Sequence, residues 1–154
     1  SWGNAMATPP PNPNVRVERP PLSASPMLFS PVDYGADPTG NMDSTAAFQA
    51  LLGDFLAVSP SRTMAANITN LGGAIIDLQG GHYLISQPII IPPFYGNAHL
   101  KDGTLQASLH FPSDRWLVEI GNVDTCQPVK PDDHHTPDPQ YSCNEFVDLT
   151  NILL

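Results

Sequence analysis

The sequence predicts an all-β protein, a right-handed single-stranded parallel β-helix (solenoid) with an N-terminal capping α-helix. Its 154 residues contain 18 prolines and only 14% charged residues, a composition that is incompatible with a mainly helical chain. From residue 71 onward, short β-like segments are separated by Gly, Asn or Pro, and no second helical pattern follows. Because the Asn-Gly signals of β-hairpins are absent as well, these strands indicate a coil in which each turn stacks on the previous one.

The chain begins with a proline-rich arm. Eight prolines occur up to Pro31 without sustained hydrophobic periodicity, which is typical of an extended arm or linker. We therefore divide the chain into an arm at 1–30 and the N-terminal turns of an incomplete β-helix domain at 31–154. At the start of the second region, residues 32–34 are predicted to form a short strand and residues 35–40 a turn.

One helix is expected, at 44–58. Its predicted N-cap is Asp43, with Asn41 as the alternative, because a short side-chain acceptor satisfies the free amides of the first turn. The run is apolar nearly all round, so we expect it to be covered on most sides. Since an open solenoid end exposes unpaired strand edges, this helix is suited to cap the N-terminal end of the coil.

Seven β-segments are expected after the helix. They span 74–78, 82–85, 88–91, 99–100, 104–107, 116–120 and 146–149. The 22 residues from Leu78 to Leu100 correspond to one solenoid turn. A β-sandwich with equally short strands is the alternative fold. Because the last nine residues are strand-like and no capping element follows them, we expect the solenoid to be truncated at its C-terminal end.

The charge balance excludes several partners. The net charge is −9 and only six Lys and Arg residues are present, which argues against nucleic acid because phosphate binding needs clustered cations. No apolar run is long enough to span a membrane, and no basic amphipathic face suits a lipid surface. The negative field also repels a polyanionic polysaccharide, so binding one requires local cations outside this segment or a low working pH.

Two features favour a secreted protein. Cys126 and Cys143 lie 17 positions apart with proline-rich sequence between them, a spacing that suits one disulfide in an oxidising compartment. Two buried free thiols are the alternative. Asn67 begins an Asn-Ile-Thr acceptor for N-glycosylation. The opening residues lack the charged and apolar regions of a signal peptide, so we expect any signal to have been removed or cut away.

Four segments carry a resemblance to known families. Residues 32–51, a strand, a Gly-Ala turn, an Asp-Ser cap and a helix, resemble the opening signature of the pectate-lyase-like superfamily. Residues 72–85, 101–108 and 111–120 are similar to plant quartet-type polygalacturonases of glycoside hydrolase family 28. The resemblance implies a secreted, extracellular or cell-wall hydrolase of α-1,4-galacturonan (pectin) that is monomeric when complete and needs no cofactor.

The same resemblance places the catalytic aspartates in turns beyond Leu154. The polygalacturonase motifs are absent here, because Gly81-His82-Tyr83 lacks the second glycine of Gly-His-Gly and Asp132-Asp133 stands among prolines. We therefore assign no catalytic residue, no cofactor and no metal ligand to this chain. A β-1,3-glucanase or pectin lyase on the same scaffold, and a noncatalytic carbohydrate-binding β-helix module, are the alternative functions.

The remaining candidate residues have simpler interpretations. The Asp and His residues of 132–138 form a solvated loop rather than a metal site, because adjacent histidines there have no fixed geometry. Asp33, Asp37 and Asp43 fit a turn and a helix cap better than a calcium site. Five aromatic side chains have two alternative roles: they fill the core, or they form a platform on which sugar rings stack. They are Tyr34, Tyr83, Tyr95, Trp116 and His82. The cations Lys101 and Arg115 are expected to pair with nearby acidic residues.

Overall fold

The structure is a computed structural model that describes residues 27–58, 68–121 and 144–154. Its strands are joined only by parallel pairings. The elements are, in chain order, β1 (Leu28–Phe29), the 3₁₀ helix η1 (Pro31–Tyr34), β2 (Thr39–Asp43), α1 (Thr45–Leu56), β3 (Thr69–Asp77), β4 (His82–Ile85), β5 (Ile89–Ile91), β6 (Tyr95–Ala107), β7 (Val118–Ile120) and β8 (Val147–Leu153).

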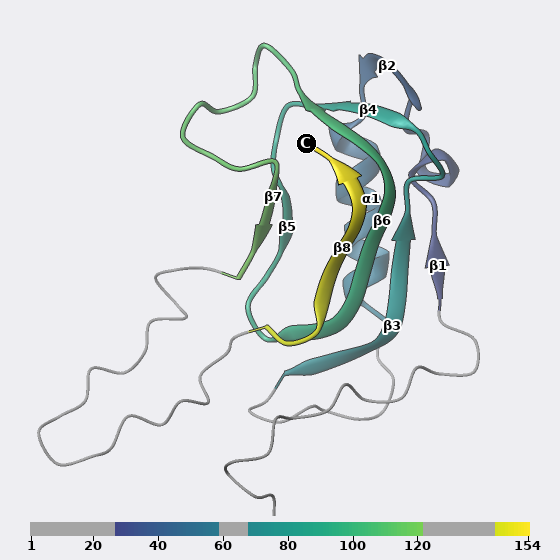
Figure 1. Cartoon of the computed structure of the whole chain (residues 1–154), viewed down its shortest axis with the longest axis vertical. Coiled ribbons are helices and arrows are strands. Elements are labelled where there is room, and N and C mark those ends of the chain that lie inside the picture. The colour runs from purple at the N-terminus through teal and green to yellow at the C-terminus, as the bar shows by residue number, and fades with distance from the viewer. Residues whose placement is uncertain (1–26, 59–67, 122–143) are drawn as a thin grey trace, which may run out of the picture.

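The strands form a curled parallel sheet rather than a sandwich of antiparallel strands (Figure 1). The bent strand β6 pairs with β3 along its first part and with β4 along its last part, while β8 pairs with β6 as well. Ile76 is opposite Leu100, 24 positions later, and His82 is opposite Thr104, 22 positions later. The predicted turn length of 22 residues therefore holds on the β4 side, but the β3 side is two residues longer.

The interior of the curl follows the two-residue period of its strands. On β3, Ala74 and Ile76 are buried, whereas Ile75 and Asp77 between and after them are half-buried and face outward. The same alternation on β6 buries Ala98 and Leu100. Burying one such aliphatic side chain is worth about 1.5–3 kcal/mol, so this interior is the main source of stability. The largest fully buried side chains include Tyr83, Phe48, Phe55, Leu51, Ile68, Leu71, Ile76, Leu78, Ile85 and Leu105.

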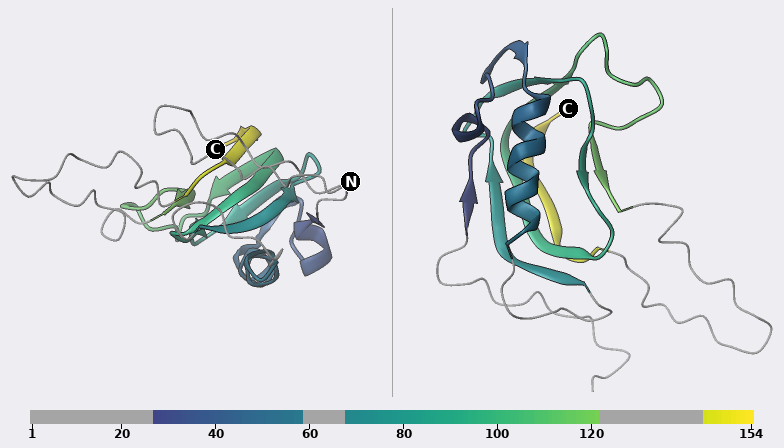
Figure 2. Two further views of the ribbon diagram at one scale, coloured as in Figure 1. Left: turned by 90° about the horizontal axis from the view of Figure 1, so that it is seen from below. Right: turned by 180° about the vertical axis from the view of Figure 1, so that it is seen from behind.

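Helix α1 lies at one end of the stack of strands and β8 at the other (Figure 2). Its buried residues are Ala47, Phe48, Leu51, Leu52 and Phe55, and the ring of Phe48 meets that of Tyr83 edge to face at 5.4 Å. The expectation that the helix is covered on most sides is wrong, because its other face is exposed. That face consists of small or polar residues, including alanines that tolerate water at little cost.

The segment before the helix differs from the prediction. Residues 32–34 form part of the 3₁₀ helix η1 instead of a strand, because Pro31 stands in its first turn and Gly35, with φ 89°, closes it by donating its N–H to Val32. The predicted turn at 35–40 is shorter than expected, since β2 already begins at Thr39.

The helix cap is shifted by one residue. Ser44 is the N-cap residue, but its Oγ accepts the N–H of Asp37 instead of capping the helix. Asp43, the predicted cap, accepts the N–H of Thr45 at 2.9 Å from the position before the cap. Asp43 thus supplies the expected acceptor at a different position.

Several strand bounds also differ. The segments predicted at 99–100 and 104–107 are one strand, β6, which continues through Asp102 in a left-handed conformation. Strand β3 begins five residues before the predicted start, and β7 omits Trp116 and Leu117. Residues 28–29, the end of the predicted arm, form β1, which places Phe29 against Phe55 with ring centres 5.5 Å apart.

Candidate functional site

The chain turns two corners in successive turns of the curl, and each corner requires residues with positive φ. At the first, which we call the asparagine bend (Asn70, Asn97 and Asn144), Asn97 has φ 56°. At the second, which we call the charged bend (Asp77, Gln79, Lys101, Asp102 and Asn151), φ is 53° at Gln79, 60° at Asp102 and 53° at Asn151. Asn and Asp adopt this conformation at lower cost than other non-glycine residues, which explains their recurrence at these corners.

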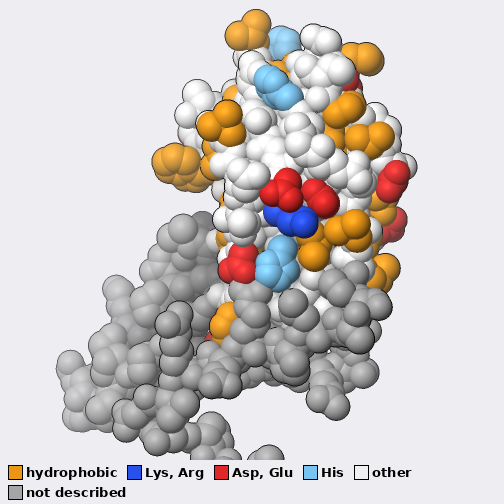
Figure 3. Space-filling model, turned by 45° about the vertical axis from the view of Figure 1, so that its right-hand side comes forward, with side chains coloured by type: hydrophobic (Ala, Val, Ile, Leu, Met, Phe, Trp, Pro, Cys, Tyr) orange, Lys and Arg blue, Asp and Glu red, His pale blue; other side chains and the backbone are white. Residues whose placement is uncertain are grey.

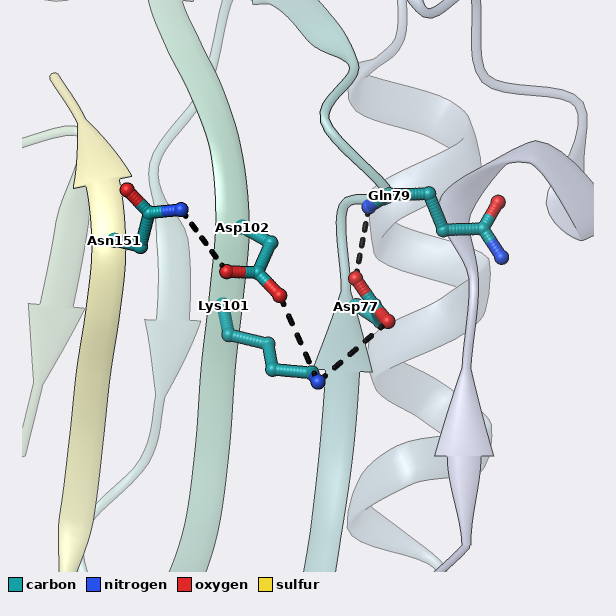
Figure 4. A network of polar contacts seen from close by, with 5 residues as sticks. All are labelled: Asp77, Gln79, Lys101, Asp102 and Asn151. Carbon is teal, nitrogen blue, oxygen red and sulfur yellow. Dashed lines mark hydrogen bonds and ion pairs between the residues drawn. The ribbon is translucent and has the colours of Figure 1, made fainter.

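In the charged bend, the ammonium group of Lys101 bridges Asp77 on β3 and Asp102 on β6, and the Asp102 carboxylate connects this pair to Asn151 on β8 (Figure 4). Lys101 Nζ lies 3.8 Å from Asp77 Oδ2 and 3.6 Å from Asp102 Oδ2. The other oxygen of Asp77 accepts the N–H of Gln79, and the other oxygen of Asp102 accepts Asn151 Nδ2. All four carboxylate oxygens are therefore engaged with groups of the chain itself.

This use of the carboxylates decides what the bend can do chemically. An inverting glycosidase holds an acid and a base about 6.5–9.5 Å apart on opposite sides of the sugar, with room for a water molecule. Here both carboxylates converge on the same cation, so the arrangement is not an acid–base pair. The bend is suited to hold successive turns in register and to present polar groups to hydroxyls.

The charged bend lies on a polar, half-exposed surface. The side chains of Lys101 and Asp102 are 37% and 41% exposed, and a hollow of about 360 Å³ lies beside the bend, lined by Gly80, Asp102, Gly103, Thr104, Asn151, Ile152 and Leu153. Two residues before Lys101 on the same strand, His99 Nδ1 lies 3.2 Å from Asp148 Oδ2 on β8. Figure 3 shows charged and histidine side chains gathered on one face of the molecule.

The asparagine bend is uncharged, and Asn97 is buried in it while Asn70 and Asn144 are half-buried. Asn97 has no exposed surface, and its Nδ2 donates to Asn70 Oδ1 at 2.9 Å. The same oxygen of Asn70 accepts the N–H of Gly72, and Asn144 Nδ2 donates to the carbonyls of Pro92 and Tyr95. Neutral amides suit this corner because they satisfy buried backbone groups without the cost of burying a charge.

Several predicted site residues lie outside the described residues. They are Cys126, Cys143, Asn67 and the Asp and His residues of 132–138, so the disulfide, the glycosylation acceptor and the loop cluster stay predictions. Within 27–58, 68–121 and 144–154, no three His, Cys, Asp or Glu side chains gather as metal ligands would.

The acidic residues before the helix have local partners. Asp37 accepts hydrogen bonds from Thr39 Oγ1 at 2.6 Å and from the backbone N–H groups of Thr39, Asn41 and Met42. These bonds, that from the Thr39 hydroxyl first, lower the pKa of Asp37 to about 2. Asp37 is thus a turn residue, as the sequence indicated.

The structure separates the five candidate sugar-stacking residues. Tyr83 is fully buried, Tyr95 packs against the core, and Tyr34 donates to Asp54 Oδ2 at 2.8 Å. His82 Nε2 lies 2.6 Å from Gln106 Oε1 in the next turn. Trp116 is 78% exposed and is the one member of this set whose ring is open to a ligand.

The prediction that the two cations pair with acidic residues is confirmed. Lys101 contacts Asp77, and Arg115 contacts Glu119.

Neither bend was predicted from the sequence. Asp102, Asn97 and Asn151 had no assigned role, because their chemistry depends on stacking with residues one or more turns away. The sequence did contain one signal. Residues that tolerate a left-handed backbone follow the alternating apolar residues of a strand, as in Lys-Asp-Gly after Leu100. Without the register, this signal does not say which residues become neighbours.

A curled stack of parallel strands with one helix and polar corners is the architecture of the pectate-lyase-like class. The family model described as "Rhamnogalacturonase A/epimerase, pectate lyase-like" matches residues 29–124, and the chain belongs to that family. Polygalacturonase QRT3 of Arabidopsis thaliana is 41% identical over 117 residues. This match covers 75% of the present chain and 23% of the relative. No solved structure gives a significant match. No helix among the described residues is long and apolar enough to cross a bilayer.

Proposed function

We propose that this chain is the N-terminal part of a polygalacturonase-like glycoside hydrolase that cuts α-1,4-galacturonan in the cell wall. The observation that carries the proposal is the 41% identity to a protein named polygalacturonase, together with membership of a pectate-lyase-like family. The catalytic aspartates belong to turns outside this chain. The engaged carboxylates of Asp77 and Asp102 support this placement, because neither is arranged to flank a sugar.

The proposed fold is a right-handed parallel β-helix whose N-terminal end is capped by α1. Support comes from the buried face of the helix, where Phe48 and Phe55 contact residues of β4 and β1. The domain proposal stays a proline-rich arm at 1–30 followed by the first turns of the solenoid. Further turns on β8 would cover Leu149 and Leu153, which are 39% and 66% exposed.

The substrate proposal places the protein outside the cell as a monomer acting on a polysaccharide. A net charge of −9 is compatible with this role where the working pH is low enough to protonate part of the galacturonan. The proposed disulfide between Cys126 and Cys143 and a glycan on Asn67 both fit an oxidising, secretory route. Peptide mapping of the secreted protein before and after reduction tests both modifications.

The decisive experiment is an assay of the full-length secreted protein on polygalacturonate. Reducing ends should appear without unsaturated products, and replacing an aspartate of the later turns with asparagine should abolish them. Unsaturated products would identify a lyase instead. Release from β-1,3-glucan would identify a glucanase, and binding without release from any polysaccharide would leave a noncatalytic module.

A further inference from the structure

The loop between β6 and β7 borders an open hollow that shares no lining residue with either bend. The loop stands away from the stacked strands (Figure 1). The hollow measures about 530 Å³, and the residues that line it include Ser108, Ser113, Arg115 and Trp116. Its size lies within the range of roughly 300–1,000 Å³ that is usual for small-molecule sites. Apolar walls with a few hydroxyl and guanidinium groups are also typical of such sites.

Trp116 gives this hollow a flat apolar surface. Its side chain is 78% exposed, so the indole is not part of the hydrophobic core. An aromatic face attracts the C–H groups on the flat side of a pyranose ring, while polar groups at the rim bind the hydroxyls. Ser108 and Ser113 place hydroxyl groups around the same hollow.

Glu119 holds the loop in place. Its two oxygens accept Nε and Nη2 of Arg115, each at 2.6 Å, and Oε1 also accepts the N–H of Trp116 at 3.3 Å. These hydrogen bonds raise the pKa of Arg115 and lower that of Glu119, so both groups stay ionised. Two of the five guanidinium N–H donors are used in this way, and the described residues provide no acceptor for the others.

The local charge selects against an anionic ligand. The positive charge of Arg115 is matched by Glu119, and Asp114 adds a second negative charge beside it. The rest of the chain is also negative, with a net charge of −9. A carboxylate entering the hollow would therefore meet a net repulsive field, whereas an uncharged ring would not.

We propose that this hollow is a subsite for an uncharged pyranose ring, stacked on Trp116 and hydrogen-bonded to Arg115, with ionised uronate rings excluded. The inference rests on the proposed function and specifies its substrate. On a galacturonan chain, an uncharged ring is a methyl-esterified uronate, and a neutral sugar side chain has the same chemistry. Trp116 is a binding residue here and Glu119 a positioning residue.

The test measures affinity by titration calorimetry at low salt on the full-length secreted protein, with an aspartate of the later turns replaced by asparagine so that the probes are not cut. Hydrolysis is measured on the same full-length protein with that aspartate in place. The probes are oligogalacturonides of one length, fully methyl-esterified or fully de-esterified, and a neutral galactan oligosaccharide of the same length. The esterified probe should bind at least about 10-fold more tightly than the de-esterified one, with the ratio shrinking as added salt screens the field. Tighter binding of galactan than of esterified galacturonide would assign the subsite to side-chain sugars.

Three variants sharpen the test. Trp116→Ala should weaken binding of the uncharged probes by about 3- to 10-fold, the range expected for one aromatic contact. Phe94→Ala, which truncates another exposed aromatic side chain away from the hollow, should leave affinity unchanged. Glu119→Gln removes one negative charge and should raise affinity for the de-esterified probe, which a merely structural role would not do.

The inference is overturned if no probe binds, if the de-esterified probe binds as well as the esterified one, or if a folded Trp116→Ala protein keeps full affinity. Reducing ends are measured in parallel on both substrates. Hydrolysis that does not depend on Trp116 would refute the subsite and leave the proposed hydrolase intact. Selective binding without hydrolysis would support the subsite and refute the proposed hydrolase.

Discussion

The asparagine bend and the charged bend both place a non-glycine residue of β6 in the left-handed region, Asn97 with φ 56° and Asp102 with φ 60°. Their surroundings are opposite. Asn97 has no exposed surface and bonds to a neighbouring amide, whereas the side chain of Asp102 is 41% exposed and pairs with Lys101. One backbone requirement is thus met with neutral amides where water is excluded and with ions where water is present.

This difference indicates which corner depends on its side chains. A buried amide that loses its partner leaves a polar group without water, at a cost of about 1–3 kcal/mol. An exposed ion pair that is broken is resolvated, and typically contributes about 0–1 kcal/mol. The asparagine bend should therefore be sensitive to every side-chain change, while the charged bend should be sensitive mainly where the backbone is crowded.

The largest effect is expected at Gly103, a crowded glycine next to the charged bend. A Cβ added at Gly103 would lie 2.4 Å from Leu78 Cβ and 2.9 Å from the carbonyl oxygen of Gly81. Gly103→Ala should therefore destabilise the protein by about 3 kcal/mol, the upper end of the cost of overpacking. Urea unfolding monitored by circular dichroism measures this.

Gly53→Ala is the matched control for that substitution. A Cβ at Gly53 meets no atom within 4 Å, and the residue lies on the exposed face of α1. Alanine is favoured over glycine inside a helix by about 1 kcal/mol, so this variant should be more stable than wild type. Equal midpoints for the two alanine variants would mean that the contact of Gly103 with Leu78 and Gly81, in the turn between β3 and β4, is looser than the structure has it.

The second largest effect is expected in the asparagine bend. Asn97→Ala removes the hydrogen bond to Asn70 and places alanine at positive φ, so it should cost about 2–3 kcal/mol. Asn97→Gly keeps the favourable backbone and should recover about 1 kcal/mol of that loss. If alanine and glycine at position 97 gave the same free energy of unfolding, the left-handed backbone would not contribute.

The sequence predicted the inward-facing residues of this fold better than its corners. Alternation identified the strand at 82–85 with its observed bounds, and the helix was placed to within two residues at its C-terminal end. Both patterns come from burial, which acts on each segment separately. The short strand predicted at 32–34 was wrong because Pro31 and Gly35 impose a local turn that outweighs β-propensity.

The corners could not be predicted in the same way, because their partners lie in other turns. Asp77 and Lys101 become neighbours only through the register of β3 on β6, and the same pairing brings Asn70 to Asn97. The exposure of Trp116 was equally unpredictable, since the side chain of an aromatic residue before a strand can face the core or the solvent. The stacking of turns is a tertiary property, and the sequence alone indicates only the local structure of each turn.

A smaller effect separates charge from backbone in the charged bend. Asp102→Asn keeps a residue that tolerates positive φ and should cost less than about 0.5 kcal/mol, whereas Asp102→Ala should cost about 1 kcal/mol. Thermal unfolding of the two variants side by side measures the difference. Equal losses for the two variants, both of which remove the charge, would show that the ion pair, not the backbone, controls this corner.

A similarly small effect is expected for the ammonium group of Lys101. Lys101→Met keeps most of the aliphatic stem but leaves Asp77 and Asp102 facing each other without a cation. Because these groups are partly solvated, the loss should be about 0.5 kcal/mol at low salt and should vanish near 1 M salt, where the Debye length is only about 3 Å. Unfolding midpoints across a salt series measure this. A loss that stays constant with salt would mean that Lys101 acts through packing, and the contrast between a buried, side-chain-dependent bend and an exposed, tolerant one would fail.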